Sequence, residues 1–324
     1  MKKIVLFDTA QGSLNLGDDI IKECLEQEME FVFNNECIAR YSTHTPISRF
    51  YQTFRKNIIY KTCNSADYKF LCGTNLFKSS LIRISPDWNI NFTSCEYYRG
   101  SIAIGCGMDM NAKHSDPYTR WIYKQILSKD YIHSVRDERT KRYFESLGVK
   151  AINTGCPTLW GLTPKICASI PRNKNKYVVF TLTDYKRDEA KDKKMISVLR
   201  ECYDKLYFWV QGFHDYDYLS SIADMNDIRV IPHSINAYRE VLLLDNIDYV
   251  GTRLHAGVYA MRHGVRSLII SVDNRADDMK ETYNIPTLSR YKIEDKLKDI
   301  ITANFETKII IPTDRIEQWK GQFK

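Results

Sequence analysis

The chain has 324 residues, of which 44% are hydrophobic and 27% are charged, and its net charge is +7. These values are typical of a globular protein and exclude a disordered chain, and no apolar run approaches the ~20 residues that cross a bilayer. The length exceeds what a single core comfortably holds, so we expect two domains. The positive charge suits an anionic substrate or the inner membrane surface, and it is too weak to indicate a nucleic-acid-binding protein.

The nine cysteines are scattered along the chain, and no Cys-x-x-Cys pair occurs. This spacing indicates neither a zinc site nor a redox dithiol. Cys72 and Cys106 stand inside apolar runs, where a thiol packs as a small hydrophobe. We therefore expect a reduced, cytoplasmic protein without a structural metal. The opening residues 2–7 are predicted to be a first strand, because Asp8 cuts the apolar run too short for an export signal.

Strands and helices alternate along the first half of the chain. The hydrophobic pattern predicts strands at 2–7, 37–41, 68–72, 101–107, 131–135 and 151–154. It predicts helices at 18–29, with Asp18 as the N-cap, and at 47–58, 116–127 and 136–147. The aromatic segment 87–98 shows no clear pattern.

The alternation resumes after residues 163–176, a segment with prolines and basic residues that we interpret as a linker. Further strands are predicted at 177–182, 207–210, 228–231, 247–250 and 267–272. Helices are predicted at 186–204, 215–224, 234–244, 254–263, 276–283, 293–303 and 314–323. Short turns between such elements are typical of parallel sheets with helices on both faces. The sequence therefore predicts the α/β class, with two Rossmann-like, doubly wound domains, 1–165 and 166–324, that face a cleft.

The turn after the predicted strand 247–250 is the first candidate site. A glycine and a threonine end the apolar run, Arg253 and His255 follow, and helical spacing begins at Leu254. Open α/β sheets bind ligands beyond the carboxyl ends of their strands, and helix N-termini favour anions. We therefore expect Arg253 and His255 to hold a phosphate or carboxylate. The alternative is a surface arginine beside a histidine that only caps the helix.

Other loops after predicted strands supply further candidates. These loops contribute Asn15, Gly17, Asp18, Asn75, Gly105 and Arg136. Asp18 is either a substrate contact or a simple N-cap, and Arg136 is either a second cation or part of an exposed charged turn. The glycine-bearing turns at Asn75 and Gly105 let the backbone approach a ligand, although a tight turn alone would also explain them.

The order of these motifs resembles that of the polysaccharide pyruvyl transferases over roughly residues 4–290. The matching motifs are Asn-x-Gly-Asp at 15–18, the glycine turn at Gly73, Gly-x-Gly at 105–107, Val-Arg-Asp at 135–137, Gly-Thr-Arg-Leu-His at 251–255 and the strand leading to Asp273. Two positions depart from the family pattern. Gly73-Thr-Asn75 replaces a glycine-rich run, and Arg275 replaces a common lysine, which keeps the charge but changes the donor geometry.

The resemblance implies a fold like that of the GT-B glycosyltransferases, with domain 1–165 on the acceptor side and domain 166–324 on the donor side. It implies transfer of a pyruvyl group from phosphoenolpyruvate to a sugar as a ketal, without a cofactor or metal. Forked cations such as Arg136 and Arg253 would hold the anionic donor, and His255 would act as the acid or the base. Substrate contacts are also expected from Asn15, Gly17, Asp18, Asn75, Gly105 and Arg275.

Two other functions stay open at this stage. A GT-B-type glycosyltransferase would meet the diphosphate of a nucleotide sugar with Arg253 and His255. A non-catalytic saccharide-binding protein would respond to neither donor. The resemblance implies an acceptor in capsule, exopolysaccharide or cell-wall biosynthesis, often lipid-linked, and hence a cytoplasmic protein at the inner face of the membrane. The sequence leaves the acceptor sugar and the oligomeric state open.

Overall fold

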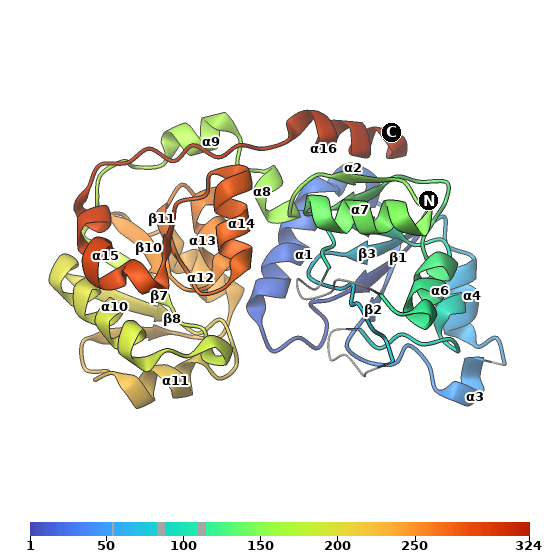
Figure 1. Cartoon of the computed structure of the whole chain (residues 1–324), viewed down its shortest axis with the longest axis horizontal. Helices are drawn as coiled ribbons and strands as arrows, with labels where there is room; N and C mark the ends of the chain where they lie inside the picture. The colour runs from blue at the N-terminus through green and yellow to red at the C-terminus, as the bar shows by residue number, and fades with distance from the viewer. Residues whose placement is uncertain (54, 83–87, 109–114) are drawn as a thin grey trace. The chain divides into compact units, whose positions relative to one another are not determined.

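The computed structural model describes residues 1–53, 55–82, 88–108 and 115–324 (Figure 1). The chain divides into two compact units. Unit 1 consists of Met1–Ser13, Ile21–Trp160 and Pro312–Lys324, and unit 2 consists of Leu14–Ile20 and Gly161–Ile311. The main boundary therefore lies at 160/161, a short N-terminal segment belongs to unit 2, and the C-terminal segment belongs to unit 1.

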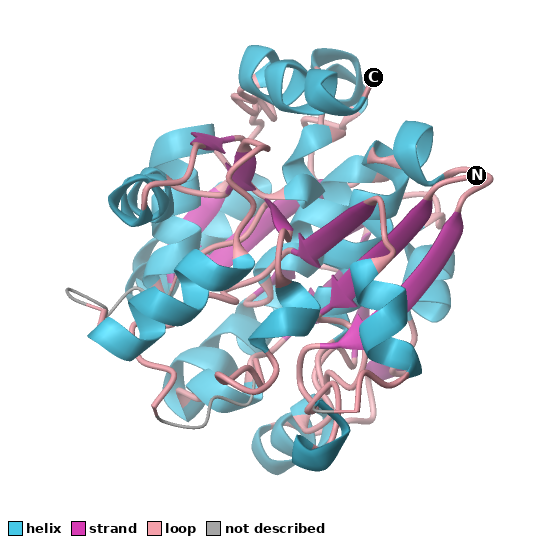
Figure 2. Cartoon of the chain, turned by 90° about the vertical axis from the view of Figure 1, so that its right-hand side faces the viewer, coloured by secondary structure: helices cyan, strands magenta, loops and turns pink. Residues whose placement is uncertain are grey.

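Unit 1 contains a parallel sheet in the order β2-β1-β3-β4, the beginning of the flavodoxin-like order. Its strands are β1 Lys3–Asp8, β2 Cys37–Ser42, β3 Tyr68–Cys72 and β4 Ile102–Ile104, and a separate parallel pair consists of β5 His133–Val135 and β6 Ala151–Asn153. Its helices are α2 Glu30–Phe33, α3 Phe50–Thr53, α4 Ile58–Asn64, α5 Cys95–Tyr98, α6 Pro117–Ile126, α7 Glu138–Leu147, α8 Pro157–Trp160 and α16 Thr313–Lys320, with the 3-10 turn η3 Gly321–Phe323. Helix α1, Leu16–Glu28, begins in unit 2 and ends in unit 1. Figure 2 shows the strands of this unit running between helices.

Side chains link β4 to β5 where backbone pairing is incomplete. The Ala103 N–H donates to Nδ1 of His133 at 3.1 Å, and the Gly105 N–H donates to the Ser134 hydroxyl at 2.9 Å. Since Nδ1 accepts, Nε2 carries the proton and donates to the Ser128 carbonyl at 2.9 Å. Burial lowers the pKa of His133 to about 4, so the ring is neutral. The His133 and Ser134 side chains thus replace two ladder bonds of the sheet.

Unit 2 contains a six-stranded parallel sheet in the order β12-β11-β10-β7-β8-β9, which is the Rossmann order. Its strands are β7 Tyr177–Thr181, β8 Lys205–Trp209, β9 Ile228–Ile231, β10 Ile247–Gly251, β11 Arg266–Ser271 and β12 Thr287–Ser289. Its helices and turns are α9 Pro164–Ser169, η1 Asp184–Lys186, α10 Glu189–Cys202, α11 Asp215–Ile222, α12 Ile235–Leu242, α13 Leu254–Arg262, α14 Asn274–Tyr283, η2 Arg290–Lys292 and α15 Ile293–Thr302.

Several predicted elements differ from the observed ones for local reasons. The helix expected at 47–58 is two short helices, because Lys56 has a left-handed φ of 43° and the Asn57 side chain caps α4 by accepting from the Tyr60 N–H at 2.8 Å. The predicted N-cap Asp18 lies inside the first turn of α1, and Asn15 caps the helix instead. The expected linker 163–176 contains α9, and β12 was missed because its three residues are too short for a hydrophobic period.

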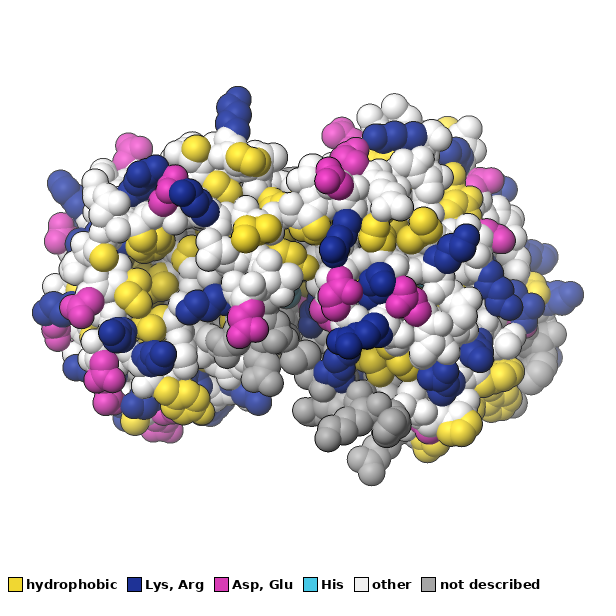
Figure 3. Space-filling model, turned by 45° about the horizontal axis from the view of Figure 1, so that its top comes forward, with side chains coloured by type: hydrophobic (Ala, Val, Ile, Leu, Met, Phe, Trp, Pro, Cys, Tyr) yellow, Lys and Arg dark blue, Asp and Glu magenta, His cyan; other side chains and the backbone are white. Residues whose placement is uncertain are grey.

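The surface carries both signs of charge. Figure 3 shows basic and acidic side chains interspersed over one face, so the net charge of +7 does not gather into one basic patch there. All nine cysteines are described and are free thiols. Within the described ranges, no helix combines the length and apolar character that a membrane span requires.

Candidate functional site

The switch point of the unit 2 sheet lies between β7 and β10, which run side by side while their connections leave in opposite directions. Ligand crevices of doubly wound folds form at this point, beyond the carboxyl ends of the strands. The turn after β10 carries Arg253, as predicted, and α13 begins at the next residue. Arg253 is therefore still in the turn, the condition under which it and His255 can approach one ligand.

The Arg253 side chain is only 3% exposed and is held by three strand ends. Its Nε donates to the Leu182 carbonyl after β7 at 2.9 Å and to Asp215 after β8 at 3.2 Å. Its Nη2 donates to Asp184 at 2.8 Å and to the second carboxylate oxygen of Asp215. The Tyr185 ring lies 5.0 Å from the guanidinium carbon. The arginine predicted to bind an anion is thus already paired with two carboxylates.

Asp215 is the most deeply committed partner of Arg253. It is fully buried and also accepts hydrogen bonds from the Gly212 N–H at 2.6 Å and the Asp184 N–H at 3.2 Å. Burial raises the pKa of Asp215, while the Arg253 guanidinium opposes that rise. Asp184 is 18% exposed and is the partner that an incoming anion could more readily displace. Because Arg253 is paired with both carboxylates, its primary role in this structure is to link the ends of neighbouring strands.

The predicted residues Asn15 and Gly17 lie in unit 2 beside the loop after β8. The Leu16 N–H donates to the Gln211 carbonyl at 3.0 Å, and the Phe213 N–H donates to the Leu14 carbonyl at 3.0 Å. Oδ1 of Asn15 accepts from Nε2 of Gln211 at 2.7 Å and from the Gly17 N–H at 3.1 Å. These bonds fix the start of α1 on the same edge of the sheet as Arg253.

His255 is the second residue of α13 and is half-buried. Its position at a helix N-terminus beyond a strand end agrees with the predicted placement. Asp18 is half-buried in the first turn of α1. Arg275 lies on α14, and its side chain is outside the described part of the structure.

Unit 1 brings two predicted residues together over a glycine. A Cβ on Gly107, which follows β4, would overlap Nε of Arg136 and would lie 2.8 Å from Oδ1 of Asn75. Arg136 follows β5, is 11% exposed and lies 3.7 Å from the Asp137 carboxylate. Oδ1 of Asn75 is buried and accepts no hydrogen bond from the described residues. An unpaired buried acceptor is costly, so this atom is suited to a ligand donor such as a hydroxyl.

Gly105, predicted as a ligand contact, has an evident structural role. Its φ is +59°, and a Cβ there would overlap the ring of Pro157.

The turn after β3 is also unusual, because Thr74 adopts a φ of 56°, which is rare for a β-branched residue. The Gly107 N–H donates to the Thr74 carbonyl at 2.8 Å and holds this turn against the turn after β4. This hydrogen bond brings Asn75 beside Gly107. Residues with strained backbone angles such as that of Thr74 are common at functional sites.

Sequence reasoning missed Asp184, Gln211 and Asp215. Each follows a strand that was predicted correctly, so the rule that sites lie beyond carboxyl ends could have included them. Oε1 of Gln211 is a further buried acceptor without a partner among the described residues. The described part of the chain contains no group of three or more His, Cys, Asp or Glu side chains that could hold a metal ion.

Comparison with solved structures identifies the fold. The chain is similar to Staphylococcus aureus MnaA bound to UDP, with a TM-score of 0.51, 10% identity, and coverage of 98% of this chain and 95% of that chain. It is also similar to Neisseria meningitidis UDP-GlcNAc 2-epimerase bound to UDP-GlcNAc (0.49, 13%, 99% and 99%) and to Escherichia coli heptosyltransferase WaaC (0.39, 11%, 83% and 88%). The first likeness shows the fold, and the predicted α/β class of GT-B type is confirmed.

The family follows from the sequence itself. Residues 15–274 match the polysaccharide pyruvyl transferase family, and the chain belongs to that family. The match begins at Asn15 and includes Arg136, Arg253 and His255. A search of curated proteins gave no match. The suspected family is thereby confirmed, and the chain is a transferase of polysaccharide biosynthesis.

Proposed function

We propose that this protein transfers a pyruvyl group from phosphoenolpyruvate to a sugar of a cell-surface polysaccharide or of its lipid-linked precursor, forming a ketal. The family match over residues 15–274 is the observation that carries this proposal. The acceptor class places the reaction at the cytoplasmic face of the membrane, with peripheral association. No cofactor is required, since phosphoenolpyruvate is itself the activated donor.

The reaction sets clear demands on the site. Two sugar oxygens form bonds to C2 of the pyruvyl unit, and the bond between C2 and the phosphate oxygen breaks. One hydroxyl proton ends on the former CH₂ carbon, and the other leaves with phosphate. The site must therefore hold an anion, supply a proton to carbon and accept one from a hydroxyl.

The described side chains suit these demands. Arg136 offers a forked cation in unit 1, and Nη2 of Arg253 offers another in unit 2 if the donor displaces the more exposed Asp184. His255 is the proposed acid or base. Oδ1 of Asn75 suits a sugar hydroxyl, consistent with an acceptor role for unit 1 and a donor role for unit 2. Asn15, Gly17, Asp18, Gly105 and Arg275 remain proposed contacts or supports of this site.

A nucleotide-sugar glycosyltransferase is the main alternative, because MnaA and this chain share a fold and that structure contains UDP. A fold alone supports this function weakly, since one scaffold hosts many chemistries. A saccharide-binding protein without a donor is the other alternative. The donor distinguishes all three.

The test is the melting temperature of the purified protein with phosphoenolpyruvate and with a panel of nucleotide sugars. A ligand at about 100 times its Kd stabilises the folded state by about 2.7 kcal/mol, which raises the melting temperature measurably. We expect phosphoenolpyruvate to raise it and nucleotide sugars to leave it unchanged. Stabilisation by a nucleotide sugar alone would assign the glycosyltransferase function instead, and no shift with either would leave the saccharide-binding protein.

Gly107→Ala sharpens this test. The new methyl group overlaps the flexible end of Arg136 and crowds Oδ1 of Asn75, so it displaces the cation without breaking a helix or strand. We expect the phosphoenolpyruvate shift to shrink in this variant. Gly321→Ala is the matched control, because a Cβ there meets nothing within 4 Å. His255→Ala should keep the donor shift and lose phosphate release in the presence of acceptor.

A further inference from the structure

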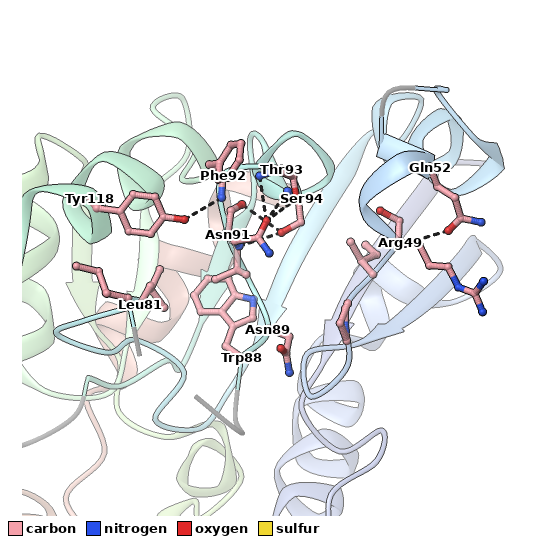
Figure 4. A pocket seen from close by; sticks show the side chains of 15 residues that line it. Arg49, Gln52, Leu81, Trp88, Asn89, Asn91, Phe92, Thr93, Ser94 and Tyr118 are labelled. Carbon is pink, nitrogen blue, oxygen red and sulfur yellow. Dashed lines mark hydrogen bonds between the residues drawn. The ribbon is translucent and has the colours of Figure 1, made fainter. Parts of the chain in front are cut away.

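A cavity of about 1160 Å³ lies in unit 1, apart from the residues discussed so far. Residues 46–49 and Gln52, which follow β2, line one part of it, and residues 81–82 and 88–94, which follow β3, line another. Figure 4 shows these two walls, with Arg49 and Gln52 on one side and Leu81, Trp88, Asn91, Phe92 and Tyr118 on the other. Both walls follow carboxyl ends of parallel strands, as the turn at Asn75 does, so the cavity belongs to the ligand-binding edge of this sheet.

Hydrogen bonds tie the cavity to the end of β1. Asn89 in the cavity wall donates its side-chain amide to the His44 carbonyl at 2.6 Å, and its N–H to the Thr43 carbonyl at 2.8 Å. The His44 ring in turn contacts the Thr9 carbonyl, directly after β1, at 2.7 Å. The wall is thus anchored beside the switch point between β1 and β3, where unit 1 is expected to bind its ligand.

The amides that line the cavity each use one half of their hydrogen-bonding capacity on the protein. Oδ1 of Asn91 accepts from the Thr93 and Ser94 N–H groups at 3.0 and 3.2 Å. Oε1 of Gln52 accepts from the Arg49 N–H at 3.0 Å. The amide nitrogens of Asn91 and Gln52 donate to no partner within the described ranges. These groups are therefore held in place with donors to spare for a ligand.

The composition of the lining selects a class of ligand. Phe92, which is 59% exposed, and the half-buried Tyr118 provide aromatic surface, while the Trp88 ring is buried behind the wall. Of the described side chains that line the cavity, none is a carboxylate, and Arg49 is the single charge. A lipid chain would bury the amides without partners, which is unfavourable. Aromatic faces beside amide donors instead suit sugar rings, either neutral or carrying a carboxylate.

We propose that this cavity binds an oligosaccharide segment of the acceptor, two or more sugar residues long. Its volume exceeds the roughly 300–1,000 Å³ of pockets for drug-sized ligands, so it has room for more than one ring. Recognition then extends beyond the sugar that receives the pyruvyl group. This inference rests on the proposed function, because it concerns the acceptor of that reaction.

The experiment measures saccharide binding by saturation-transfer NMR and calorimetry without phosphoenolpyruvate. The probes are neutral and uronic-acid trisaccharides, with the matching monosaccharides and farnesyl phosphate for comparison. We expect a trisaccharide to bind and its monosaccharide to bind at least roughly tenfold more weakly. Phe92→Ala removes an aromatic face, and Leu81→Trp fills part of the cavity. Each variant should weaken trisaccharide binding by a similar factor. Phe31→Ala on α2, at 48% exposure, is the matched control and should bind normally.

Three outcomes would overturn the inference. The protein could bind farnesyl phosphate and no saccharide, it could bind the trisaccharide equally well in Phe92→Ala and Leu81→Trp, or it could bind none of the probes. The donor test is separate. Trisaccharide binding without a phosphoenolpyruvate shift would uphold the cavity assignment and reject pyruvyl transfer. A phosphoenolpyruvate shift without trisaccharide binding would do the reverse.

Discussion

At the scale of single residues, Arg253 has a structural role, as the partner of two carboxylates, and a proposed role in donor binding. A substitution would affect both roles at once. Its guanidinium compensates the fully buried Asp215 as well as Asp184. Removing one partner of a buried ion pair costs about 3–5 kcal/mol, because the other charge is left uncompensated. We expect Arg253→Ala to lower the free energy of unfolding by about that amount, measured by urea denaturation. Arg253→Lys should cost less, since it keeps the charge but loses the forked geometry.

A double-mutant cycle isolates this effect. Asp215→Asn removes the stranded charge while keeping an oxygen for the Gly212 N–H. The double variant Arg253→Ala/Asp215→Asn should therefore lose less free energy of unfolding than the sum of the losses in the two single variants. Strict additivity would mean that the pair does not compensate charge. If the pair does compensate charge, structural damage alone can explain a loss of donor binding in Arg253→Ala, and that loss does not by itself demonstrate direct contact with the donor.

The positions of the candidate residues were more predictable than their partners. Arg253 and His255 stand at a strand–turn–helix junction, which hydrophobic periodicity and a glycine mark clearly. The carboxylates that pair with Arg253 stand at the starts of α11 and η1, 38 and 69 positions away in the chain. No local pattern encodes such a pairing, because it depends on which strand ends meet in the sheet. The proximity of Asn75 and Arg136 at Gly107 likewise depends on which strand ends are neighbours in the sheet.

At the scale of elements, the junction of β4 and β5 depends on a neutral histidine. His133 has a pKa of about 4 in the fold and about 6.5 when unfolded. The unfolded chain therefore takes up a proton first as the pH falls below 6.5, and the stability contributed by the neutral ring is lost progressively toward pH 4. We expect His133 to account for about 2 kcal/mol of lost stability between pH 7.5 and pH 5.

Comparison with His133→Gln measures this contribution. Glutamine offers an acceptor for the Ala103 N–H and a donor for the Ser128 carbonyl, but it does not titrate. Urea midpoints at the two pH values should fall less in the variant than in the parent. Equal falls would show that His133 does not titrate on unfolding in this range. Other titrating groups cancel in the difference between the two proteins.

The elements that sequence patterns predicted well are the long buried strands, and the short ones depart most. Strands β1, β3, β7 and β10 begin and end within a residue or two of expectation, because each consists mainly of buried apolar residues. The strand expected at 101–107 is shorter, with β4 spanning Ile102–Ile104, since side chains of His133 and Ser134 take over its ladder bonds. Side-chain substitution of backbone pairing leaves no periodic signal.

At the scale of the whole molecule, the chain exchanges segments between its two units. The first turn of α1 belongs to unit 2 because residues 14–16 pair with the backbone at 211–213. Composition marks a boundary near the prolines at 163–176, but it cannot show that the chain returns to unit 1 at Pro312. That return depends on packing of a short helix whose own hydrophobic pattern is weak.

The returning segment should stabilise unit 1 selectively. Trp319 is fully buried, its Nε1 donates to the Ile132 carbonyl at 2.7 Å, and its ring lies 5.7 Å from that of Trp160. Trp319→Ala should cost about 3–5 kcal/mol, as expected for a buried tryptophan. Peptide-resolved hydrogen exchange should then show faster exchange in β5 and β6, with β10 and β11 unchanged. Trp121→Ala on α6, where the ring is 47% exposed, is the control and should alter neither. Equal acceleration in both sheets would mean instead that the two units unfold as one cooperative body.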